Sequence, residues 1–305
     1  MTSTARDAVR CVVVTWNPDV ERLAAVLDAL TPQVAGIIVV DNGSRDFDAL
    51  ATRWSGREEL EFVGLPENRG IAAALNAGVT RALAKDPAWI LTMDQDTLVG
   101  DGAVAAALDD LAALDEPIRS RCALVALRPH PQPASIWLTR YAERLLVTGS
   151  LGAFVERRGV ITSGNLVRAD VAREVAYDER LFIDQVDFDF CYSLRRRGFR
   201  VVQQTTITMD HILGERYDDV ERLHPYENAQ RLYYIVRNST YLVLRRRLLV
   251  RHYAAQVVMF CGAYVSVNGA RSAAQCARVV AVGVADGVLG RLGRREYRFL
   301  AQGRR

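Results

Sequence analysis

Residues 88–96 read Ala-Trp-Ile-Leu-Thr-Met-Asp-Gln-Asp, an apolar run that ends in two carboxylates. The apolar part, 88–93, predicts a buried β-strand bounded by turn residues. Open α/β sheets bind their ligands at the carboxyl ends of the strands, which is where Asp94 and Asp96 fall. Because neighbouring like charges repel, a divalent metal that bridges both acids to a diphosphate explains them better than stability does. The triplet therefore indicates an enzyme that handles a nucleotide-linked substrate.

Apolar runs alternate with helical patterns on both sides of this strand. The sequence predicts further strands at 12–15, 36–40, 60–65 and 123–127, and helices at 17–30, 71–84 and 103–114. Such alternation predicts an α/β fold with a parallel, doubly wound sheet, whose polar strand ends line one edge. After Arg128 the prediction changes to shorter strands, a helix over 186–197 and a strand pair at 200–204 and 207–210. From Pro225 onward the chain is expected to be helical almost to its end.

The composition is that of a globular protein able to bury a sizeable core. Half of the 305 residues are hydrophobic and a quarter are charged. A net charge of +3 predicts no nucleic-acid partner. Five scattered cysteines fit reduced core thiols in a cytosol, and residues 1–10 show no signal-peptide pattern. These features predict a cytoplasmic location.

The charge is distributed unevenly along the chain. From Val236 to the end there are thirteen arginines and two acidic residues, a net +11 that leaves −8 for the preceding part. The arginine run 245–247, followed by the apolar residues 248–250, is typical of a membrane-surface element. Core packing with a solvated basic edge is an equally weighted alternative. The uncharged run 253–270 is expected to be an amphipathic or buried helix, because it contains polar residues and is short for a membrane span.

Three polar features follow the predicted strands or lie in the next helix. Asp41 opens an Asp-Asn-Gly-Ser turn, where its carboxylate either closes the turn or accepts from the ring N–H of a uracil or thymine. The Asn-Arg-Gly segment 68–70 precedes a helix, and it is either a cap and turn or a diphosphate site that uses backbone N–H groups and the helix dipole. Asn76 and Gly78 are unusual in an alanine-rich helix, and they can mark a close approach to a ligand.

A second acidic cluster, residues 182–189, reads Phe-Ile-Asp-Gln-Val-Asp-Phe-Asp at the start of a predicted helix. Acids there complement the helix dipole, which accounts for one or two of the three. A carboxylate among aromatic residues has a raised pKa, which suits a general base. Asp184 and Asp187 share a helical face if the helix starts early, whereas Asp187 and Asp189 do not.

Two candidates remain further along the chain. His211 ends a predicted strand, where it is either a satisfied structural group or a third metal ligand. Tyr234, Arg237 and Tyr241 are spaced for one face of a helix. That face either carries a snorkelling arginine or binds an anion.

Five short motifs in a fixed order make the chain resemble a known family. They are Val-Val-Thr-Trp-Asn-Pro (13–18), Val-Asp-Asn-Gly-Ser (40–44), Glu-Asn-Arg-Gly-Ile-Ala (67–72), Met-Asp-Gln-Asp (93–96) and Phe-Ile-Asp-Gln-Val-Asp-Phe-Asp (182–189). The chain resembles the family 2 inverting glycosyltransferases of GT-A fold, and most of all the bacterial rhamnosyltransferases that build O-antigens. The resemblance implies a Rossmann-like, mostly parallel sheet flanked by helices. It implies a catalytic domain over 1–224, divided near residue 128 into nucleotide-sugar and acceptor halves, and a helical, basic region over 225–305.

The resemblance also implies roles for individual residues. Asp187 matches the catalytic base, with Asp189 left open because Val186 stands where many relatives carry an acid. The implied nucleotide-sugar contacts are Thr15, Asn17, Asp41, Asn68, Arg69, Gly70, Asn76, Asp94 and Gln95. The implied ligands of Mg²⁺ or Mn²⁺ are Asp94, Asp96 and His211. Positions near the diphosphate or the acceptor match Ser163, Gly164, Asp189, Arg237 and Asn238.

The activity implied by the resemblance is inverting transfer of L-rhamnose from dTDP-L-rhamnose to a glycan acceptor carried on a lipid diphosphate. The enzyme would then work in the cytoplasm, peripherally bound to the inner face of the plasma membrane. A UDP-sugar or galactofuranose donor is the alternative within the enzyme class. A non-catalytic nucleotide-sugar binding module is the alternative outside it. A nucleic-acid binder is disfavoured, because the arginine tail has no recognisable reading motif.

Overall fold

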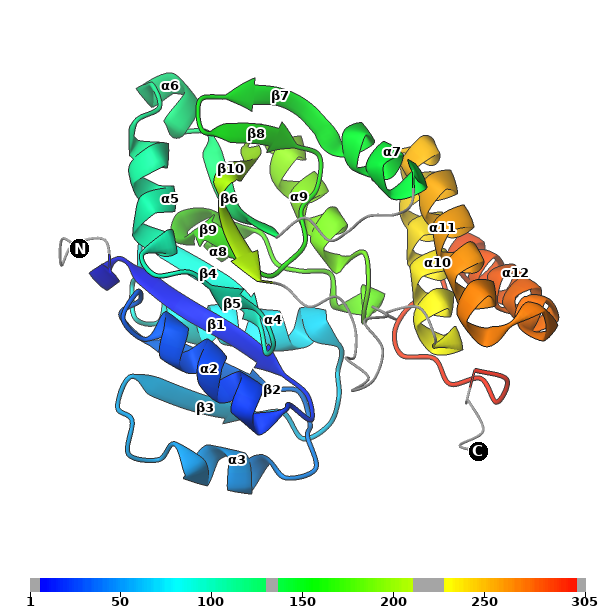
Figure 1. Ribbon diagram of the computed structural model, residues 1–305, viewed down its shortest axis with the longest axis horizontal. Coiled ribbons are helices and arrows are strands. Elements are labelled where there is room, and N and C mark those ends of the chain that lie inside the picture. The colour runs from blue at the N-terminus through cyan, green and yellow to red at the C-terminus, as the bar shows by residue number, and fades with distance from the viewer. Residues whose placement is uncertain (1–5, 130–136, 211–227, 301–305) are drawn as a thin grey trace.

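A computed structural model describes residues 6–129, 137–210 and 228–300. One sheet crosses the molecule, helices cover its faces, and three further helices stand beside it (Figure 1). The strands are β1 (Val9–Thr15), β2 (Ile37–Asp41), β3 (Leu60–Gly64), β4 (Trp89–Asp94), β5 (Leu98–Val99), β6 (Cys122–Pro129), β7 (Val147–Leu151), β8 (Phe154–Arg157), β9 (Asn165–Arg168) and β10 (Arg200–Asp210). The helices are α2 (Val20–Leu30), α3 (Phe47–Arg53), α4 (Ile71–Leu83), α5 (Ala103–Ala112), α6 (Glu116–Arg119), α7 (Trp137–Leu146), α8 (Ala169–Glu174), α9 (Val186–Arg196), α10 (Ala229–Leu244), α11 (Val250–Asn268) and α12 (Ala273–Leu289), with the 3-10 turns η1 (Glu179–Leu181) and η2 (Ala270–Ser272).

The first half of the sheet is parallel, as the alternating pattern predicted. β1 pairs with β2 on one side and with β4 on the other, and β3 extends the sheet beyond β2. In this register Thr15 lies opposite Asp41, and Val14 lies opposite Asp94. The topology therefore brings the ends of three strands, each followed by a predicted ligand-binding motif, to one edge.

The second half of the sheet is mixed: β10 pairs in parallel with β6, and antiparallel strands are added to the expected mostly parallel sheet. β9 runs antiparallel between β4 and β6, and β8 pairs antiparallel with both β7 and β10. β7 and β8 are joined by a tight turn and need no helical crossover, which parallel neighbours require. β10 is one long strand whose register shifts between Gln203 and Thr208, where the sequence predicted two strands.

Two apolar clusters, one on each face of the sheet, hold the helices in place. α2 and α5 pack on one face, and α4, α8 and α9 pack on the other. α2 begins at Val20, and not at residue 17 as predicted, because the Asp19 side chain accepts two backbone N–H groups of the first turn. α4 lies so close to the sheet that a Cβ at Gly78 would be 2.3 Å from Val12 Cγ1. This packing, and not the predicted approach to a ligand, explains the glycine.

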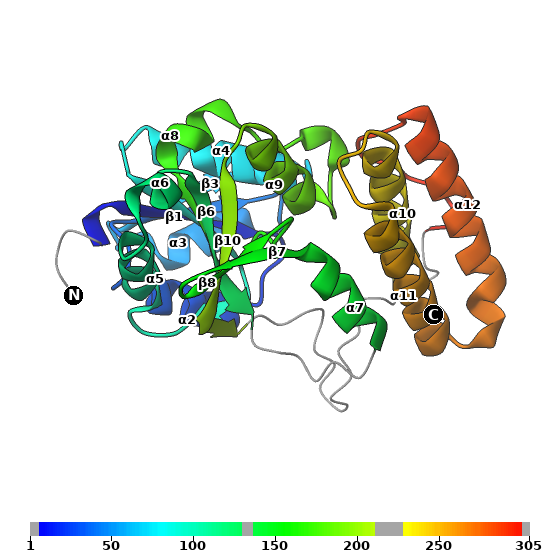
Figure 2. The ribbon, with the colours of Figure 1, turned by 90° about the horizontal axis from the view of Figure 1, so that it is seen from above.

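The C-terminal helices α10, α11 and α12 stand together at one side of the sheet (Figure 2). α10 packs along α12 and against α11, around an apolar cluster that includes Tyr233 and Tyr264. Among the described helices, one stretch, Ala270–Leu289, has the length and hydropathy of a membrane span, with 28% of it buried. A core helix can meet the same two criteria, so this stretch alone defines no topology.

Candidate active site

The carboxyl ends of β1 and β2 are joined around Asp41. Its carboxylate accepts from Thr15 Oγ1 at 3.0 Å, from Ser44 Oγ at 2.5 Å and from Ser44 N at 2.7 Å. Thr15 and Asp41 are both fully buried. The structure therefore gives Asp41 the turn-closing role that the sequence offered as the alternative, and Thr15 supports it.

Further hydrogen bonds connect the end of β1 to both of its neighbours. Asn17 N donates to Ser44 Oγ at 2.6 Å on the β2 side. Trp16 N donates to Gln95 Oε1 at 2.8 Å on the β4 side. The Trp16 side chain is 52% exposed, which leaves a large aromatic face open at this edge. We call this rim the strand-end edge; it comprises residues 15–17, 41–44, 68–70 and 94–96.

The Asn-Arg-Gly segment carries the edge to the start of α4. Asn42 Oδ1 accepts from Arg69 N at 3.0 Å, and Asn68 Oδ1 accepts from Gly70 N at 3.0 Å. Gly70 has φ +89°, and a Cβ there would lie 2.4 Å from Phe182 O, so glycine is required. Asn68 and Arg69 therefore precede a helix N-terminus, whose dipole favours an anion.

Asp94 and Asp96 are partly exposed at the end of β4. Asp94 N donates to Ser163 Oγ at 3.0 Å, and Arg22 Nε donates to the backbone oxygen of Asp96 at 2.8 Å. Gly164, with φ +77°, packs so tightly that a Cβ would be 2.4 Å from the Met209 sulfur. The structure thus brings Ser163 and Gly164 next to Asp94, where they brace the acidic turn.

The donor atoms of this turn fit a hard divalent cation. Mg²⁺ typically takes one or two protein carboxylates and completes its shell with phosphate oxygens and water, and Asp94 and Asp96 supply such a pair. The third predicted ligand, His211, lies outside the described residues. Within the ranges that the structure describes, no group of three His, Cys, Asp or Glu side chains could hold a metal alone. The fit is therefore to a cation shared with a bound diphosphate.

Asp187 lies in the first turn of α9 with its side chain partly exposed. Burial raises the pKa of Asp187 to about 7, and the charges of Asp184 and Asp94 add to this rise, while the N–H of Phe188, at 2.9 Å from Oδ1, opposes it. Asp94 and Asp187 therefore lie within electrostatic range of each other, although 93 positions separate them in the chain. A carboxylate with a pKa near neutrality, within electrostatic range of Asp94, is suited to act as a general base.

The other two acids of the cluster have arginine partners. Asp189 is 4% exposed, and its Oδ1 lies 2.6 Å from Arg247 Nη1. Asp184 Oδ1 lies 3.3 Å from Arg231 Nε. Burial raises the pKa of both acids, and the arginines oppose that rise. The ion pair of Asp189 favours Asp187 in the choice of base that the sequence left open.

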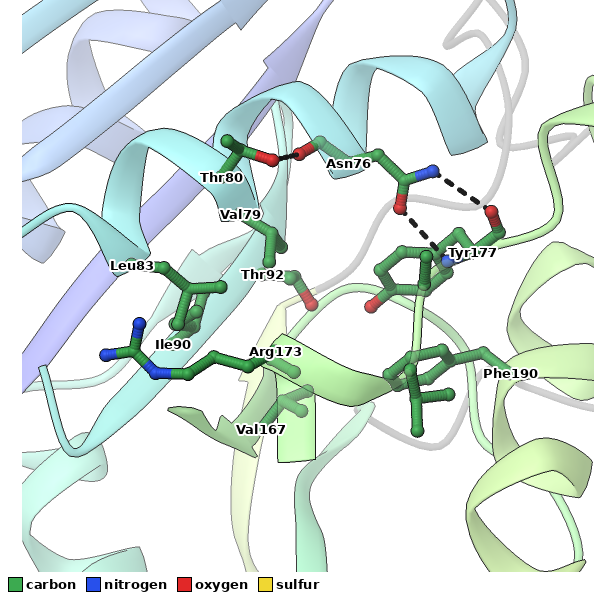
Figure 3. Close-up of a pocket in the computed structure, with 13 residues that line it drawn as sticks. Asn76, Val79, Thr80, Leu83, Ile90, Thr92, Val167, Arg173, Tyr177 and Phe190 are labelled. Atoms are coloured by element: carbon green, nitrogen blue, oxygen red, sulfur yellow. Dashed lines mark hydrogen bonds between the residues drawn. The ribbon is translucent and has the colours of Figure 1, made fainter. Parts of the chain in front are cut away.

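The Asn76 side chain braces α4 against the segment 177–179. Its Nδ2 donates to Tyr177 O and Glu179 Oε1, and its Oδ1 accepts from Tyr177 N, all at 3.0 Å (Figure 3). It borders a cavity of about 240 Å³ between α4, β4 and α8, where the rings of Tyr177 and Phe190 stack at 4.2 Å. Neither Asp94 nor Asp187 lines this cavity. The predicted nucleotide contact of Asn76 is therefore corrected to a structural role.

Arg237 and Asn238 are also placed differently from the prediction. Both are fully buried in α10, and their side chains donate to backbone carbonyls, among them Leu181 O. These donors are thus directed at the protein itself, so the structure does not support the predicted contact with diphosphate or acceptor. The reason is tertiary: the segment before α9 crosses α10 at this point.

Comparisons with known proteins agree with this geometry. Residues 11–118 match the profile described as glycosyl transferase family 2. The chain is 29% identical over 241 residues to "dTDP-rhamnosyl transferase RfbF" of Shigella flexneri, a match that covers 78% of this chain and 80% of that protein. The profile match and this relative support a family 2 glycosyltransferase. The chain is similar to rhamnosyltransferases, as its motifs indicated.

Solved structures show that this glycosyltransferase has the GT-A fold. GalNAc-T7, solved with UDP, GalNAc and Mn²⁺, matches with a TM-score of 0.53 at 15% identity; the match covers 84% of this chain and 54% of that one, so the chain spans about half its length. Residues 1–349 of TarS from S. aureus, solved with UDP-GlcNAc, match with a TM-score of 0.51 at 14% identity over 85% and 72% of the two chains. The expected fold class, an α/β GT-A sheet with a C-terminal helical region, is confirmed.

Several residues of the glycosyltransferase site were not predicted from sequence. Ser44 and Trp16 belong to the strand-end edge, and both stand inside the motifs that carried the resemblance. Arg247, Arg231 and Gln256 contact the segment that presents Asp187, from helices beyond residue 228. One sequence signal could have indicated that the C-terminal helices contact this segment. Arg237 and Asn238 lie inside an apolar helix, and a buried polar pair there needs hydrogen-bond partners.

Proposed function

We propose that the chain transfers L-rhamnose from dTDP-L-rhamnose to a glycan hydroxyl with inversion at the anomeric carbon, in the synthesis of a surface polysaccharide. The observation that carries this proposal is that Asp187 has a pKa of about 7, raised chiefly by burial and also by the charges of Asp184 and of Asp94 at the strand-end edge. The similarity to a dTDP-rhamnosyl transferase supports the choice of donor.

The nucleotide and diphosphate would lie along the strand-end edge. Trp16 offers a face for stacking a base or sugar, and the turn closed by Asp41 lies at the end of the neighbouring strand. Arg69 and the N-terminus of α4 lie where they can neutralise the diphosphate. The Arg69 guanidinium also lies 3.5 Å from the Glu179 carboxylate. Because this ion pair is exposed, Arg69 can leave Glu179 for a phosphate at little cost in free energy.

The transfer itself is a single displacement. Asp187 takes the proton of the acceptor hydroxyl while that oxygen forms a bond to the anomeric carbon. At the same time the bond from this carbon to the diphosphate oxygen breaks, and dTDP leaves with the electron pair. Because attack and departure occur on opposite faces, the configuration inverts, as in inverting hydrolysis with a sugar hydroxyl in place of water.

Asp94 and Asp96, with His211 as a further candidate, would hold Mg²⁺ or Mn²⁺ against the diphosphate. A cation bound there stabilises the charge that develops on the leaving group. The presence of Mn²⁺ together with UDP in the GalNAc-T7 structure is consistent with this choice. The backbone braces at Ser163 and Arg22 keep the two carboxylates at the same end of β4.

The acceptor would be a glycan on a lipid diphosphate, reached from the cytoplasmic face of the membrane. The α10–α11 turn supports this part of the proposal. It exposes Leu244 (56%) and Val250 (65%) beside the exposed Arg245, Arg246 and Arg251, a combination suited to an anionic lipid surface.

A vesicle experiment tests the membrane part. The full chain should sediment with anionic vesicles and be released as salt is added, and Arg246→Ala combined with Val250→Ser should weaken binding. Arg53→Ala, an exposed arginine on α3, is the matched control and should leave binding unchanged. Binding that is insensitive to both salt and the double substitution would contradict the assignment.

A donor panel tests the central proposal. We expect nucleoside diphosphate release in the presence of Mg²⁺ or Mn²⁺ to be fastest from dTDP-L-rhamnose, compared with UDP-sugars and a galactofuranose donor. A faster reaction with one of the others would replace the donor and keep the enzyme class. Tight donor binding without release from any donor would favour the non-catalytic binding module.

A further inference from the structure

The segment that presents Asp187 has an unusual backbone. Phe182, Asp184 and Gln185 have φ values of +67°, +61° and +64°, a region that non-glycine residues seldom adopt. Phe182, with ψ −67°, is the centre of a γ-turn closed by Ile183 N donating to Leu181 O at 2.9 Å. A γ-turn of this sign is rare and strained. The surrounding structure must therefore hold the segment in place.

Two adjacent side chains of α10, Arg237 and Asn238, hold this segment in place. Asn238 Nδ2 lies within hydrogen-bond distance of three carbonyls of the segment, Leu181 O (2.9 Å), Ile183 O (2.8 Å) and Asp184 O (2.9 Å). Arg237 Nη2 donates to Leu181 O at 2.8 Å, and Arg237 Nε donates to Asn238 Oδ1 at 2.8 Å. The guanidinium therefore also orients the amide.

The guanidinium is fixed in its turn by other contacts. Arg237 Nη1 donates to Gly293 O at 2.6 Å, and its charge lies 4.7 Å from the ring centre of Tyr234. The Tyr234 ring also packs against Phe182, with the ring centres 5.2 Å apart. Arg237 is thus held by contacts outside residues 181–185 as well as by the segment itself.

Contacts from the same helical region continue through the start of α9. Arg231 of α10 pairs with Asp184, and Gln256 of α11 accepts from Gln185 Nε2 at 3.2 Å. On the opposite side, Phe182 O accepts from Ile71 N at 2.8 Å, directly after Gly70 of the strand-end edge. The segment is therefore fixed between the predicted diphosphate loop and the C-terminal helices.

We propose that Arg237 and Asn238 are positioning residues, which hold the strained segment 181–185 so that Asp187 faces the strand-end edge. They touch neither donor nor acceptor. They act through the three carbonyls, which lie shortly before Asp187 in the chain, and through the start of α9. The inference rests on the proposed function in one respect, the role of Asp187 as the base.

Asn238→Ala is the first test, because it removes the amide from three buried carbonyls. The readouts are donor affinity and stoichiometry with dTDP-L-rhamnose and Mg²⁺, dTDP release with water as acceptor, and hydrogen exchange in residues 181–187. We expect kcat per donor-binding site to fall about 10²-fold, the effect of a misplacement near 1 Å, with donor Kd within twofold. Exchange in 181–187 should become faster.

Asn268→Ala is the matched control within the same helical region. Asn268 Nδ2 also donates to a backbone carbonyl, Tyr264 O at 2.9 Å, but within α11. This variant should keep the wild-type kcat, Kd and exchange pattern. If Asn238→Ala does not fold, Arg237→Lys is measured in its place, because it keeps the charge and loses the planar fork.

The outcomes separate positioning from stability. A kcat per binding site within twofold of wild type in the folded variant would overturn the inference. A loss of total turnover that only matches the loss of donor-binding stoichiometry, in Asn238→Ala and in Arg237→Lys alike, would also overturn it, because that pattern reports unfolding alone. Restoration of most of the activity by Asn238→Gln relative to Asn238→Ala would support it. Absence of dTDP release from the wild-type chain would refute the proposed function instead, and hydrogen exchange would still show whether Asn238 holds the segment.

Discussion

The strand-end edge and the segment that carries Asp187 are held in place by different means. At the edge, β1, β2 and β4 lie side by side, and Thr15, Trp16 and Asn17 bond to the ends of the neighbouring strands. The base segment has a strained backbone, and α10 and α11 supply side chains that hold it. Sheet topology therefore builds the donor side, whereas tertiary contacts from the end of the chain build the side that removes the proton.

The largest expected effect is on the base side alone. Asp187→Asn should lower kcat by about 10²–10⁴-fold, the contribution typical of a positioned general base. Donor affinity should change little, because the strand-end edge is built without α9. Steady-state turnover and calorimetric donor binding measure the two sides separately. Asp189→Asn is the comparison variant; a larger loss of kcat there than at Asp187 would assign the base to Asp189.

The converse experiment alters the donor side. Asp94→Asn and Asp96→Asn should each reduce metal-supported turnover by about 10²–10³-fold, since a cation on a leaving diphosphate contributes several kcal/mol. Unlike Asp187→Asn, they should weaken donor binding in the presence of Mg²⁺ and leave metal-free binding closer to wild type. Equal donor affinity with and without metal in the wild-type chain would argue against the shared-cation site.

The donor side could be predicted from the sequence because its rule is local. An apolar strand followed by a polar turn specifies where the side chains after Thr15, Asp41 and Met93 will lie, once the sheet is parallel. What the pattern could not show is how a side chain is used there. Asp41 has the position predicted for it, yet its carboxylate is occupied by Thr15 and Ser44.

The base side was predicted only in part, because its geometry depends on contacts that span more than 50 positions. The acidic cluster itself singled out Asp187, and its position among aromatic residues suggested a raised pKa, in the direction that burial gives it in the structure. Arg237 and Asn238 were recognised as unusual and then assigned to a ligand. Their partners are backbone carbonyls, which carry no sequence signal, so the pattern could not separate a buried brace from an anion site.

Gly70 is the point where the two sides touch, and substitution there should disturb both. Gly70→Ala places a Cβ 2.4 Å from Phe182 O, at φ +89° and ψ 159°, a region that is almost exclusive to glycine. We expect the free energy of unfolding to fall by about 1–3 kcal/mol from the backbone alone, with the clash in addition.

Gly102→Ala is the control for Gly70→Ala. Gly102 also has positive φ, +70°, but nothing lies within 4 Å of a Cβ there. Denaturant unfolding compares the stabilities, and hydrogen exchange at 181–187 reports the base segment. Equal losses of stability without a change in exchange would show that the contact between Gly70 and Phe182 is unimportant.

The smallest expected effects come from the titration of Asp187. Because the base must be ionised, kcat/KM should fall about tenfold per pH unit below the pKa of about 7 and level off above it.

The same raised pKa also makes the stability of the fold depend on pH, in a direction that can be predicted. A carboxyl whose folded-state pKa exceeds the unfolded value near 4 stabilises the fold below the unfolded pKa and loses that contribution as pH rises through about 7. Asp187→Asn, which stays neutral, should therefore raise the melting temperature relative to wild type at pH 8 more than at pH 5. A melting-temperature difference that is the same at both pH values would show that Asp187 has no raised pKa, and the base segment would then differ from the donor side only in how it is held.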